Sequence, residues 1–394
     1  MAMQHFKGWR GFLDPNRKSS QERGKDMRRG LIGTLALAIF GMAVIGSITT
    51  NLAEVEVEPA EVAVVEKVPT DTLRLFLVGD TGGLPIYPYY SYAQKVVAKS
   101  MENMALEKKV QMVLNVGDNI YYTGVSDEYD SRFRTSFENI YDGSGLDVPW
   151  YMIAGNHDHF GNVSAQVAYT NHSRKWHMPN LYYKLSFHVD GTTVDVLMLD
   201  TIVLCGNTAD IENGGLFDLL WNKSHDPEGP TDPAKAEEQW QWIRESLNSS
   251  RADYLFVAGH YPIHSVASHG PTHCLLERLD PMLKAFNVSA YFAGHDHTLQ
   301  HITYPNDYGH TIHYVVSGAA SRSDRSKKHV NTVGAENLQF HYPTSWNPFS
   351  QLGFSNGAFI YVEITKDNAA MTFLNGKGNE KYRMNISPRS KSSS

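Results

Sequence analysis

The sequence of 394 residues predicts an α/β domain in which two stacked mixed β-sheets are flanked by helices. Short, almost continuously apolar segments recur along the chain, and such segments are typical of strands that are buried on both faces. Amphipathic segments with a helical period lie between some of them. Hydrophobic residues make up 42% of the chain, which is enough to bury a large core.

Six apolar segments are expected to form strands, at residues 73–80, 111–118, 148–158, 194–201, 252–260 and 288–297. Helical periodicity predicts three helices among them, near residues 97–104, 233–247 and 274–286. Asp232 and Pro233 suit the N-cap and the first turn of the second helix. We therefore expect one domain over residues 72–385, followed by a disordered Ser- and Lys-rich tail at 386–394.

The segment before this domain differs from it in composition. Residues 1–29 are rich in Lys and Arg, residues 30–53 contain no charge, and residues 54–71 are acidic with two prolines. A helix of ~20 apolar residues spans a bilayer core, and an excess of Lys and Arg before the span predicts a cytosolic N-terminus. We expect a cytosolic basic tail, a single transmembrane signal-anchor and an acidic linker. The domain would then be lumenal or extracellular, in the lysosomal or secretory route. A cleaved signal peptide, which would give a secreted protein, is the alternative.

Two further features agree with that location. Asn-X-Ser/Thr sequons for glycosylation occur at Asn162, Asn171, Asn222, Asn248, Asn287 and Asn385. The chain has two cysteines, Cys205 and Cys274, and a disulfide between them would close a loop of about 70 residues in an oxidising compartment. Two free buried thiols are the alternative.

Charge limits the kinds of partner that the domain is expected to bind. The formal net charge is -7, and no long basic run lies outside the N-terminal tail. Nucleic-acid binding usually requires a basic face, so no nucleic-acid partner is expected. The sequence does not predict the oligomeric state.

Polar side chains follow the expected strands at the points where those strands end. They are Asp80, Asp118, Tyr121, Asn156, His260, His295 and His297, in five loops that each contain Gly. Each one taken singly is more often a turn or packing residue. Ligands bind at the carboxyl ends of strands in open α/β sheets, so five such loops are expected to converge on one site. Oxygen and imidazole ligands without thiolates suit first-row metal ions. A carboxylate such as that of Asp118 can bridge two ions ~3.5–4 Å apart, as in two-metal hydrolytic sites.

The motifs in these loops resemble those of the calcineurin-like metallophosphoesterases, and specifically of their purple acid phosphatase branch. They read GD at 79–80, GDNIYYTG at 117–124, GNHDH at 155–159, GHYP at 259–262 and GHDH at 294–297. Tyr121 distinguishes the purple acid phosphatase branch from the protein Ser/Thr phosphatases, which have the sequence Asp-Arg-Gly near this position. Stretches at 154–169, 199–208 and 258–274 are similar to the mammalian tartrate-resistant acid phosphatases.

The resemblance implies hydrolysis of phosphate monoesters by a metal-activated hydroxide at a dinuclear site. It implies that Fe(III) is held by Asp80, Tyr121 and His297, that Asp118 bridges, and that Fe(II) or Zn(II) is held by Asn156, His260 and His295. One of His157 and His269 would contact the phosphoryl oxygens, and the other would protonate the leaving group. Two departures accompany this pattern: Ser268 stands where relatives carry an acid, and Thr81 where mammalian relatives carry an aromatic residue.

Two features outside the site also match the family pattern. Cys205 and Cys274 correspond to its disulfide, and residues 206–232 fall where mammalian relatives carry an exposed loop that proteases remove to raise activity. We therefore expect a lid at 206–232 and an activating protease as a partner. A metallophosphodiesterase or pyrophosphatase, and a non-enzymatic iron-binding glycoprotein, remain as alternative functions.

Overall fold

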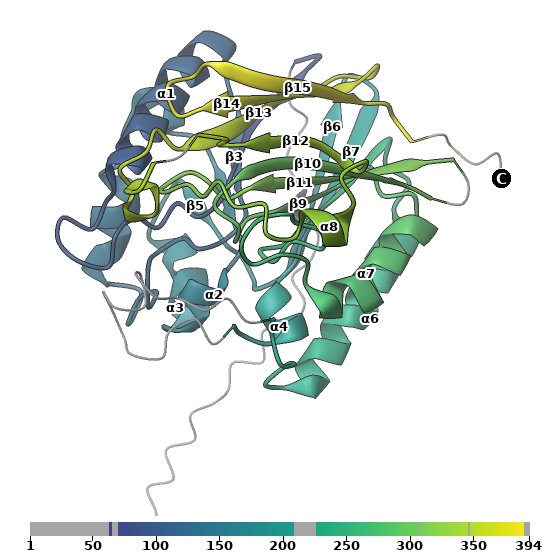
Figure 1. Ribbon diagram of the computed structural model, residues 1–394, viewed down its shortest axis with the longest axis horizontal. Helices are drawn as coiled ribbons and strands as arrows, with labels where there is room; N and C mark the ends of the chain where they lie inside the picture. Colours follow the sequence, from purple (N-terminus) through teal and green to yellow (C-terminus); the bar gives the residue numbers. More distant parts are fainter. Residues whose placement is uncertain (1–62, 65–69, 209–225, 307–308, 346, 390–394) are drawn as a thin grey trace, which may run out of the picture. The chain divides into compact units, whose positions relative to one another are not determined.

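The computed structural model describes residues 63–64, 70–208, 226–306, 309–345 and 347–389. All of these belong to a compact unit that spans Val57–Ser394. Two β-sheets lie face to face at its centre, and helices cover the outer face of each sheet (Figure 1). The predicted fold class, two stacked mixed sheets flanked by helices, is confirmed.

The first sheet has seven strands among the described residues. Their order is β15 (Glu380–Ile386), β14 (Ala369–Asn375), β13 (Ala358–Ile364), β2 (Leu73–Val78), β3 (Met112–Asn115), β4 (Trp150–Met152) and β5 (Trp176–His177). The strands β2 to β5 pair in parallel, and β13 to β15 extend the sheet with antiparallel pairs. The loops after β2, β3 and β4 therefore leave the sheet at the same edge.

The second sheet has eight strands, again counted over the described chain. Their order is β1 (Ala63–Val64), β6 (Tyr183–Val189), β7 (Thr192–Met198), β8 (Tyr254–Ala258), β9 (Ala290–Ala293), β11 (Thr311–Ser317), β10 (Leu299–Pro305) and β12 (Leu338–Tyr342). The strands β7, β8, β9 and β11 are parallel neighbours, and β1 pairs in parallel with β6. The pairs β6–β7, β10–β11 and β10–β12 are antiparallel. The loops after β8 and β9 thus share one edge of this sheet.

Alternate residues of a strand face two different cores. In β2, Leu75 and Leu77 join the core between the sheets, whereas Phe76 and Val78 pack against the helical layer outside. This alternation explains why the strands read as continuous apolar runs, since both faces are buried.

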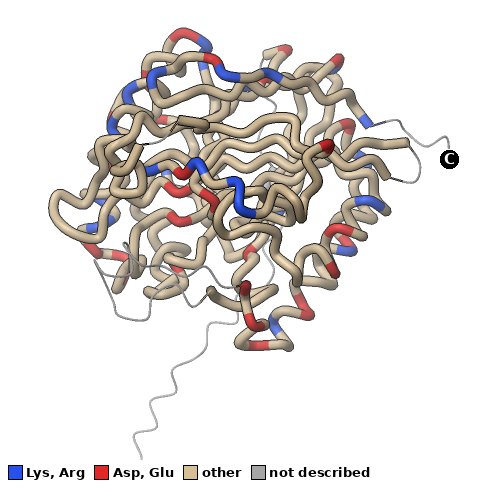
Figure 2. Tube along the Cα trace, in the orientation of Figure 1, with Lys and Arg blue, Asp and Glu red and all other residues tan. Residues whose placement is uncertain are grey.

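The longer helices lie on opposite outer faces of the two sheets (Figure 1). The described α-helices are α1 (Tyr92–Lys108), α2 (Asn156–His159), α3 (Val163–Ala168), α4 (Thr201–Cys205), α6 (Pro233–Ser249), α7 (His273–Ala285) and α8 (Val330–Val333). The three predicted helices correspond to α1, α6 and α7. As predicted, Asp232 caps α6, and its carboxylate accepts from the backbone N–H groups of Ala234 and Lys235. Both α6 and α7 carry acidic as well as basic side chains (Figure 2).

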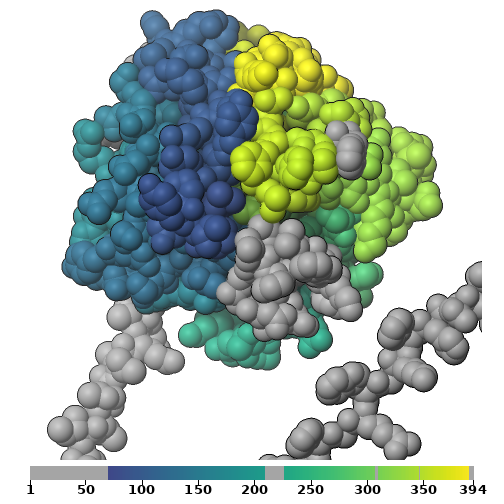
Figure 3. Space-filling view, turned by 60° about the vertical axis from the view of Figure 1, so that its left-hand side comes forward, coloured from purple at the N-terminus to yellow at the C-terminus, as the bar shows by residue number. Residues whose placement is uncertain are grey.

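Segments that are far apart in the sequence lie side by side near the first of the Gly-Asp loops. Figure 3 shows the start of the domain, in purple and blue, against the yellow-green segment that follows β12. The backbone N–H of Ala93 donates to the carbonyl of Gly353 at 2.9 Å, and the Ser91 hydroxyl donates to the carbonyl of Ser321. These bonds fix the two C-terminal loops that border the candidate site.

The predicted single-pass membrane location requires a correction. No helix in the described part of the chain is long and apolar enough to cross a membrane. The longest described helices, α1 and α6, have 17 residues each and carry charged side chains, whereas a span needs ~20 apolar residues. The expected span at 30–53 and the basic tail at 1–29 lie outside the described residues.

The structure joins Cys205 and Cys274 in a disulfide, with the two Cα atoms 5.8 Å apart. Five of the predicted glycosylation sites fall in the described chain, and all five asparagines are exposed: Asn162, Asn171, Asn248, Asn287 and Asn385. Their use stays a prediction. Asn222 lies outside the described residues, as do positions 209–225 of the expected lid at 206–232 and the end of the tail beyond residue 389.

Candidate metal centre

The loops that carry the predicted ligands meet where the two sheets approach each other. The loops after β2, β3 and β4 supply Asp80, Asp118 with Tyr121, and Asn156. The loops after β8 and β9 supply His260 and the pair His295 and His297. All of these side chains are buried except that of His297, which is 15% exposed.

The backbone of the ligand loops takes a conformation that side chains rarely favour. Three predicted ligands have positive φ angles: 58° at Asp80, 53° at Asp118 and 66° at His295. Non-glycine residues in this region cost about 1–3 kcal/mol each and cluster at functional sites. The strain therefore marks these loops as more than connections between strands.

Glycine beside the ligands allows their close approach. A Cβ atom on Gly155 would lie 2.1 Å from Oδ1 of Asp118, and one on Gly117 would lie 2.6 Å from Nδ1 of His260. Gly117 also has a φ of +94°. Only a residue without a side chain fits at either position.

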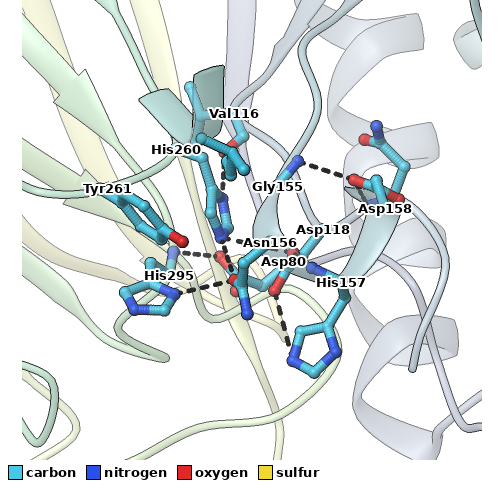
Figure 4. A network of polar contacts seen from close by, with 12 residues as sticks. Asp80, Val116, Asp118, Gly155, Asn156, His157, Asp158, His260, Tyr261 and His295 are labelled. Atoms are coloured by element: carbon cyan, nitrogen blue, oxygen red, sulfur yellow. Dashed lines mark hydrogen bonds and ion pairs between the residues drawn. The ribbon is translucent and has the colours of Figure 1, made fainter. Parts of the chain in front are cut away.

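One group of side chains gathers around Asn156 (Figure 4). The amide oxygen of Asn156 lies 3.0 Å from Nε2 of His260 and 3.1 Å from Nδ1 of His295. Oδ1 of Asp118 lies 3.4 Å from Nε2 of His260. One ligand atom from each of Asp118, His260 and His295 lies within 4.8 Å of the other two, a spacing that suits a single metal ion.

A second group gathers around the phenol of Tyr121. Its oxygen lies 2.8 Å from Oδ1 of Asp80 and 3.2 Å from Nε2 of His297, and these two partners are 3.4 Å apart. The other carboxylate oxygen of Asp80 accepts from the backbone N–H of His295 at 2.9 Å. The two groups are therefore neighbours, joined through the loop that carries both histidines.

Hydrogen bonds on the outer side orient two of the imidazoles. Nδ1 of His260 lies 2.8 Å from the carbonyl oxygen of Val116, and Nδ1 of His297 lies 3.1 Å from the amide oxygen of Gln351. In each ring Nε2 is left pointing at the group of ligands. A metal-binding histidine usually donates its second N–H to an oxygen in this way, so these donors fit a metal centre.

The site concentrates opposite charges out of contact with water. Burial raises the pKa of the Asp118 carboxyl, but His260 and His157 outweigh it and hold that pKa below its ordinary value. Burial lowers the pKa of His260, but Asp118 outweighs it and raises that pKa to about 9. The pKa of His295 is well below its ordinary value because of burial and the nearby His269 and His260. The pKa of Tyr121 is well above its ordinary value, through burial and the carboxylates of Asp118 and Asp80.

The two predicted proton-handling histidines border the ligand groups. Nδ1 of His157 lies 2.8 Å from the carbonyl oxygen of Tyr122, and its Nε2 lies 3.9 Å from Oδ2 of Asp118 (Figure 4). The ring of His269 lies 4.0 Å from that of His295, centre to centre. Ser268, where the family pattern has an acid, donates its hydroxyl to Asp324 at 2.7 Å.

Two buried carboxylates that were not predicted hold the ligand loops. Asp158 accepts from the backbone N–H groups of Asn119, Ile120 and Gly155 and so joins the loop of Asp118 to that of Asn156. Asp296 accepts from the backbone N–H of His269 and from the Ser265 hydroxyl, and so fixes the His269 loop. Both lie inside the GNHD and GHDH motifs, which was the signal available in the sequence. Arg322, a buried residue beside Tyr121, was also not predicted, because no motif marks the stretch of sequence around it.

Comparisons with known proteins agree with the motifs. A family model for calcineurin-like phosphoesterases matches residues 73–299. Tartrate-resistant acid phosphatase type 5 of Homo sapiens is 40% identical over 325 residues, which cover 82% of this chain and 93% of that protein. Purple acid phosphatase 17 of Arabidopsis thaliana is 30% identical over 275 residues, which cover 70% of this chain and 77% of that protein. The resemblance that the motifs predicted is confirmed.

Solved structures show the same fold at lower identity. GAP50, the anchor in the inner membrane complex of Plasmodium, superposes with a TM-score of 0.64 at 21% identity, covering 82% of this chain and 91% of that one. Purple acid phosphatase PPD1 from yellow lupin (Lupinus luteus) seeds superposes with a TM-score of 0.53 at 14% identity, covering 81% and 54%.

Proposed function

This chain belongs to the calcineurin-like phosphoesterase family, and we propose that it is an acid phosphatase that hydrolyses phosphate monoesters at a dinuclear, iron-containing centre. One observation carries the proposal. Asn156 Oδ1 lies between His260 and His295, while Tyr121 lies between Asp80 and His297, in an adjoining group. Two such neighbouring sets of oxygen and nitrogen donors suit a pair of metal ions.

The difference between the two sets of donors supports a proposed assignment of the ions. Asp80, Tyr121 and His297 offer a carboxylate, a phenol oxygen and an imidazole, a set that suits a hard trivalent ion such as Fe(III). Asn156, His260 and His295 offer a neutral amide and two imidazoles, which suit Fe(II) or Zn(II). Asp118 would bridge them, because it lies 3.4 Å from His260 and its loop also carries Tyr121. When bound, the ions would polarise the phosphoryl oxygens and lower the pKa of a coordinated water.

The protein's own side chains would bind and orient the substrate. His157 lies on the Asp118 side of the centre and its Nδ1 lies 2.8 Å from Tyr122 O, which directs Nε2 toward the ligands. His269 lies on the His295 side, on a loop fixed by Asp296. Protonated imidazoles here would donate to phosphoryl oxygens and to the leaving alkoxide, and acidic pH would favour that state.

The test combines metal analysis with activity on two substrates. The full chain, loaded with iron, is assayed against pH with an aryl phosphate monoester and with the matching diester. The proposal expects two metal equivalents, a visible absorption band, and a preference for the monoester at acidic pH. A preference for the diester would favour the phosphodiesterase alternative. Metal without turnover of either substrate would favour the iron-binding glycoprotein.

A further inference from the structure

Arg322 is a buried cation beside the Tyr121 group. It follows β11 and is 3% exposed. Its Nη1 donates to the hydroxyl of Tyr122, and its Nη2 donates to the carbonyl of Gly83 at 2.9 Å. Its Cζ lies 4.1 Å from the centre of the Tyr121 ring and 5.0 Å from that of Tyr122.

This environment is unusual for an arginine. A buried charge is strongly unfavourable unless it is paired and hydrogen-bonded, and the usual pair is a carboxylate. Among the ion pairs of the described chain, none includes Arg322. Two aromatic faces and two oxygen atoms take the place of the carboxylate, and a guanidinium binds aromatic faces favourably.

The guanidinium connects three loops of the site. Gly83 lies just after Asp80, and Tyr122 follows Tyr121 directly. Ser321, next to Arg322, donates its backbone N–H and its hydroxyl to the Asp80 carbonyl at 3.1 and 2.6 Å. The loop after β11 is thus fastened to the two loops that carry Asp80 and Tyr121.

The contact also extends to a histidine that is proposed to bind substrate. Nδ1 of His157 lies 2.8 Å from the carbonyl oxygen of Tyr122, and the rings of these residues lie 5.0 Å apart. The Arg322–Tyr122 hydrogen bond therefore holds the same residue that orients His157.

We propose that Arg322 is a positioning residue for this centre, which fixes Tyr121 and Tyr122 and sets the energy of the absorption band that Tyr121 gives with ferric iron. The inference rests on the proposed iron centre. A cation against an aromatic face stabilises the electrons of the ring. More energy is then needed to move an electron from the ring to the iron, so the charge shifts the band to shorter wavelength.

The test compares R322Q with R325Q in the iron-loaded full chain. Arg325 is exposed and three residues away, so R325Q removes an equal charge without these contacts. R322Q should move the band to longer wavelength and lower kcat by about 10- to 100-fold, with a smaller effect on KM. R322K, which keeps a charge but loses the planar fork, should lie between R322Q and the unaltered protein. R325Q should change neither the band nor kcat.

A second variant keeps the test decisive if R322Q does not fold. Y122F keeps the cation and both rings but removes the hydroxyl acceptor, and it should shift the band in the same direction by a smaller amount. If the band maximum is unchanged in R322Q or Y122F, the proposed role of Arg322 is overturned while the proposed iron centre still stands. The absence of any visible band in the unaltered iron-loaded protein overturns the iron centre and this inference together.

Discussion

The phenol oxygen of Tyr121 lies 2.8 Å from a carboxylate oxygen of Asp80, and both side chains are fully buried. Y121F removes this oxygen but leaves the ring in its packing. We expect the variant to fold, to lose the visible absorption band and to bind less iron, because a donor to the trivalent ion is gone. Absorption spectra and iron analysis measure this. Y141F, which removes a buried hydroxyl elsewhere, is the matched control, and a band that survives in Y121F would contradict the assignment.

The shared amide oxygen of Asn156 leads to a second prediction. N156A removes the atom that lies 3.0 Å from His260 and 3.1 Å from His295. The affinity for the divalent ion should then fall by roughly 10- to 100-fold or more, since a direct ligand is lost. Metal analysis after dialysis should show about one equivalent in place of two. N103A, on the exposed side of α1, should keep both ions. Two retained equivalents in N156A would refute its role as a ligand.

Metal binding should depend on pH through His260. Burial lowers the pKa of this histidine, but Asp118 raises it to about 9, above the ordinary value of 6.5. In the metal-free protein the charged form therefore adds stability below pH 6.5, and this stability is lost as pH rises through 9. A metal ion needs neutral imidazole, so binding at pH 7 should release a proton and tighten as pH rises. Titration calorimetry in buffers of different ionisation enthalpy measures this release, and its absence would count against His260 as a ligand.

The position of His157 predicts a loss of rate without a loss of metal. H157N removes the imidazole on the Asp118 side of the centre, and kcat should fall by about 10²- to 10⁴-fold, as for other acid–base groups. Both metal equivalents should remain. H188N, on the exposed face of β6, is the control for replacing a histidine and should not change kcat. A rate close to that of the unaltered protein would exclude His157 from the reaction.

The disulfide is expected to make a measurable contribution to the free energy of unfolding. Cys205 and Cys274 are 69 positions apart, and closing a loop of this length is worth about 4 kcal/mol in the chain-entropy model. The double variant C205S/C274S should unfold at a lower urea concentration, and its free energy of unfolding should be lower by about 4 kcal/mol. Equal midpoints for this variant and the oxidised protein would show that the crosslink does not restrain the unfolded chain.

Much of the fold was predictable because apolar pattern and buried strand coincide. The six expected strands correspond to β2, β3, β4, β7, β8 and β9, which are buried on both faces. The expected strand at 148–158 ends early, at Met152, because Asn156 begins the short helix α2. The remaining described strands were not predicted, and they include β11, which pairs in parallel with β9. In β15 the buried residues are Met384 and Ile386, and its other positions are exposed or half-buried and include three charged side chains, so it does not stand out as an apolar run.

The candidate ligands were predictable for a related reason. Each one follows an apolar strand within a few residues, so local sequence revealed both its position and its neighbours. Arg322 was missed because its partners, Gly83 and Tyr122, are 239 and 200 positions away. Its surroundings in the sequence, SGAASRSD, read as an ordinary polar turn. Contacts that form only when two sheets meet leave no periodic signal in either segment.

The central claim is that Asp118 lies between two neighbouring metal ions. Anomalous diffraction from crystals of the metal-loaded full chain tests it most directly, with data collected on both sides of the iron absorption edge. The account predicts two peaks ~3.5–4 Å apart on either side of Asp118, with an iron peak beside Tyr121 and the other peak beside Asn156. A single peak, or peaks out of reach of Asp118, would contradict it.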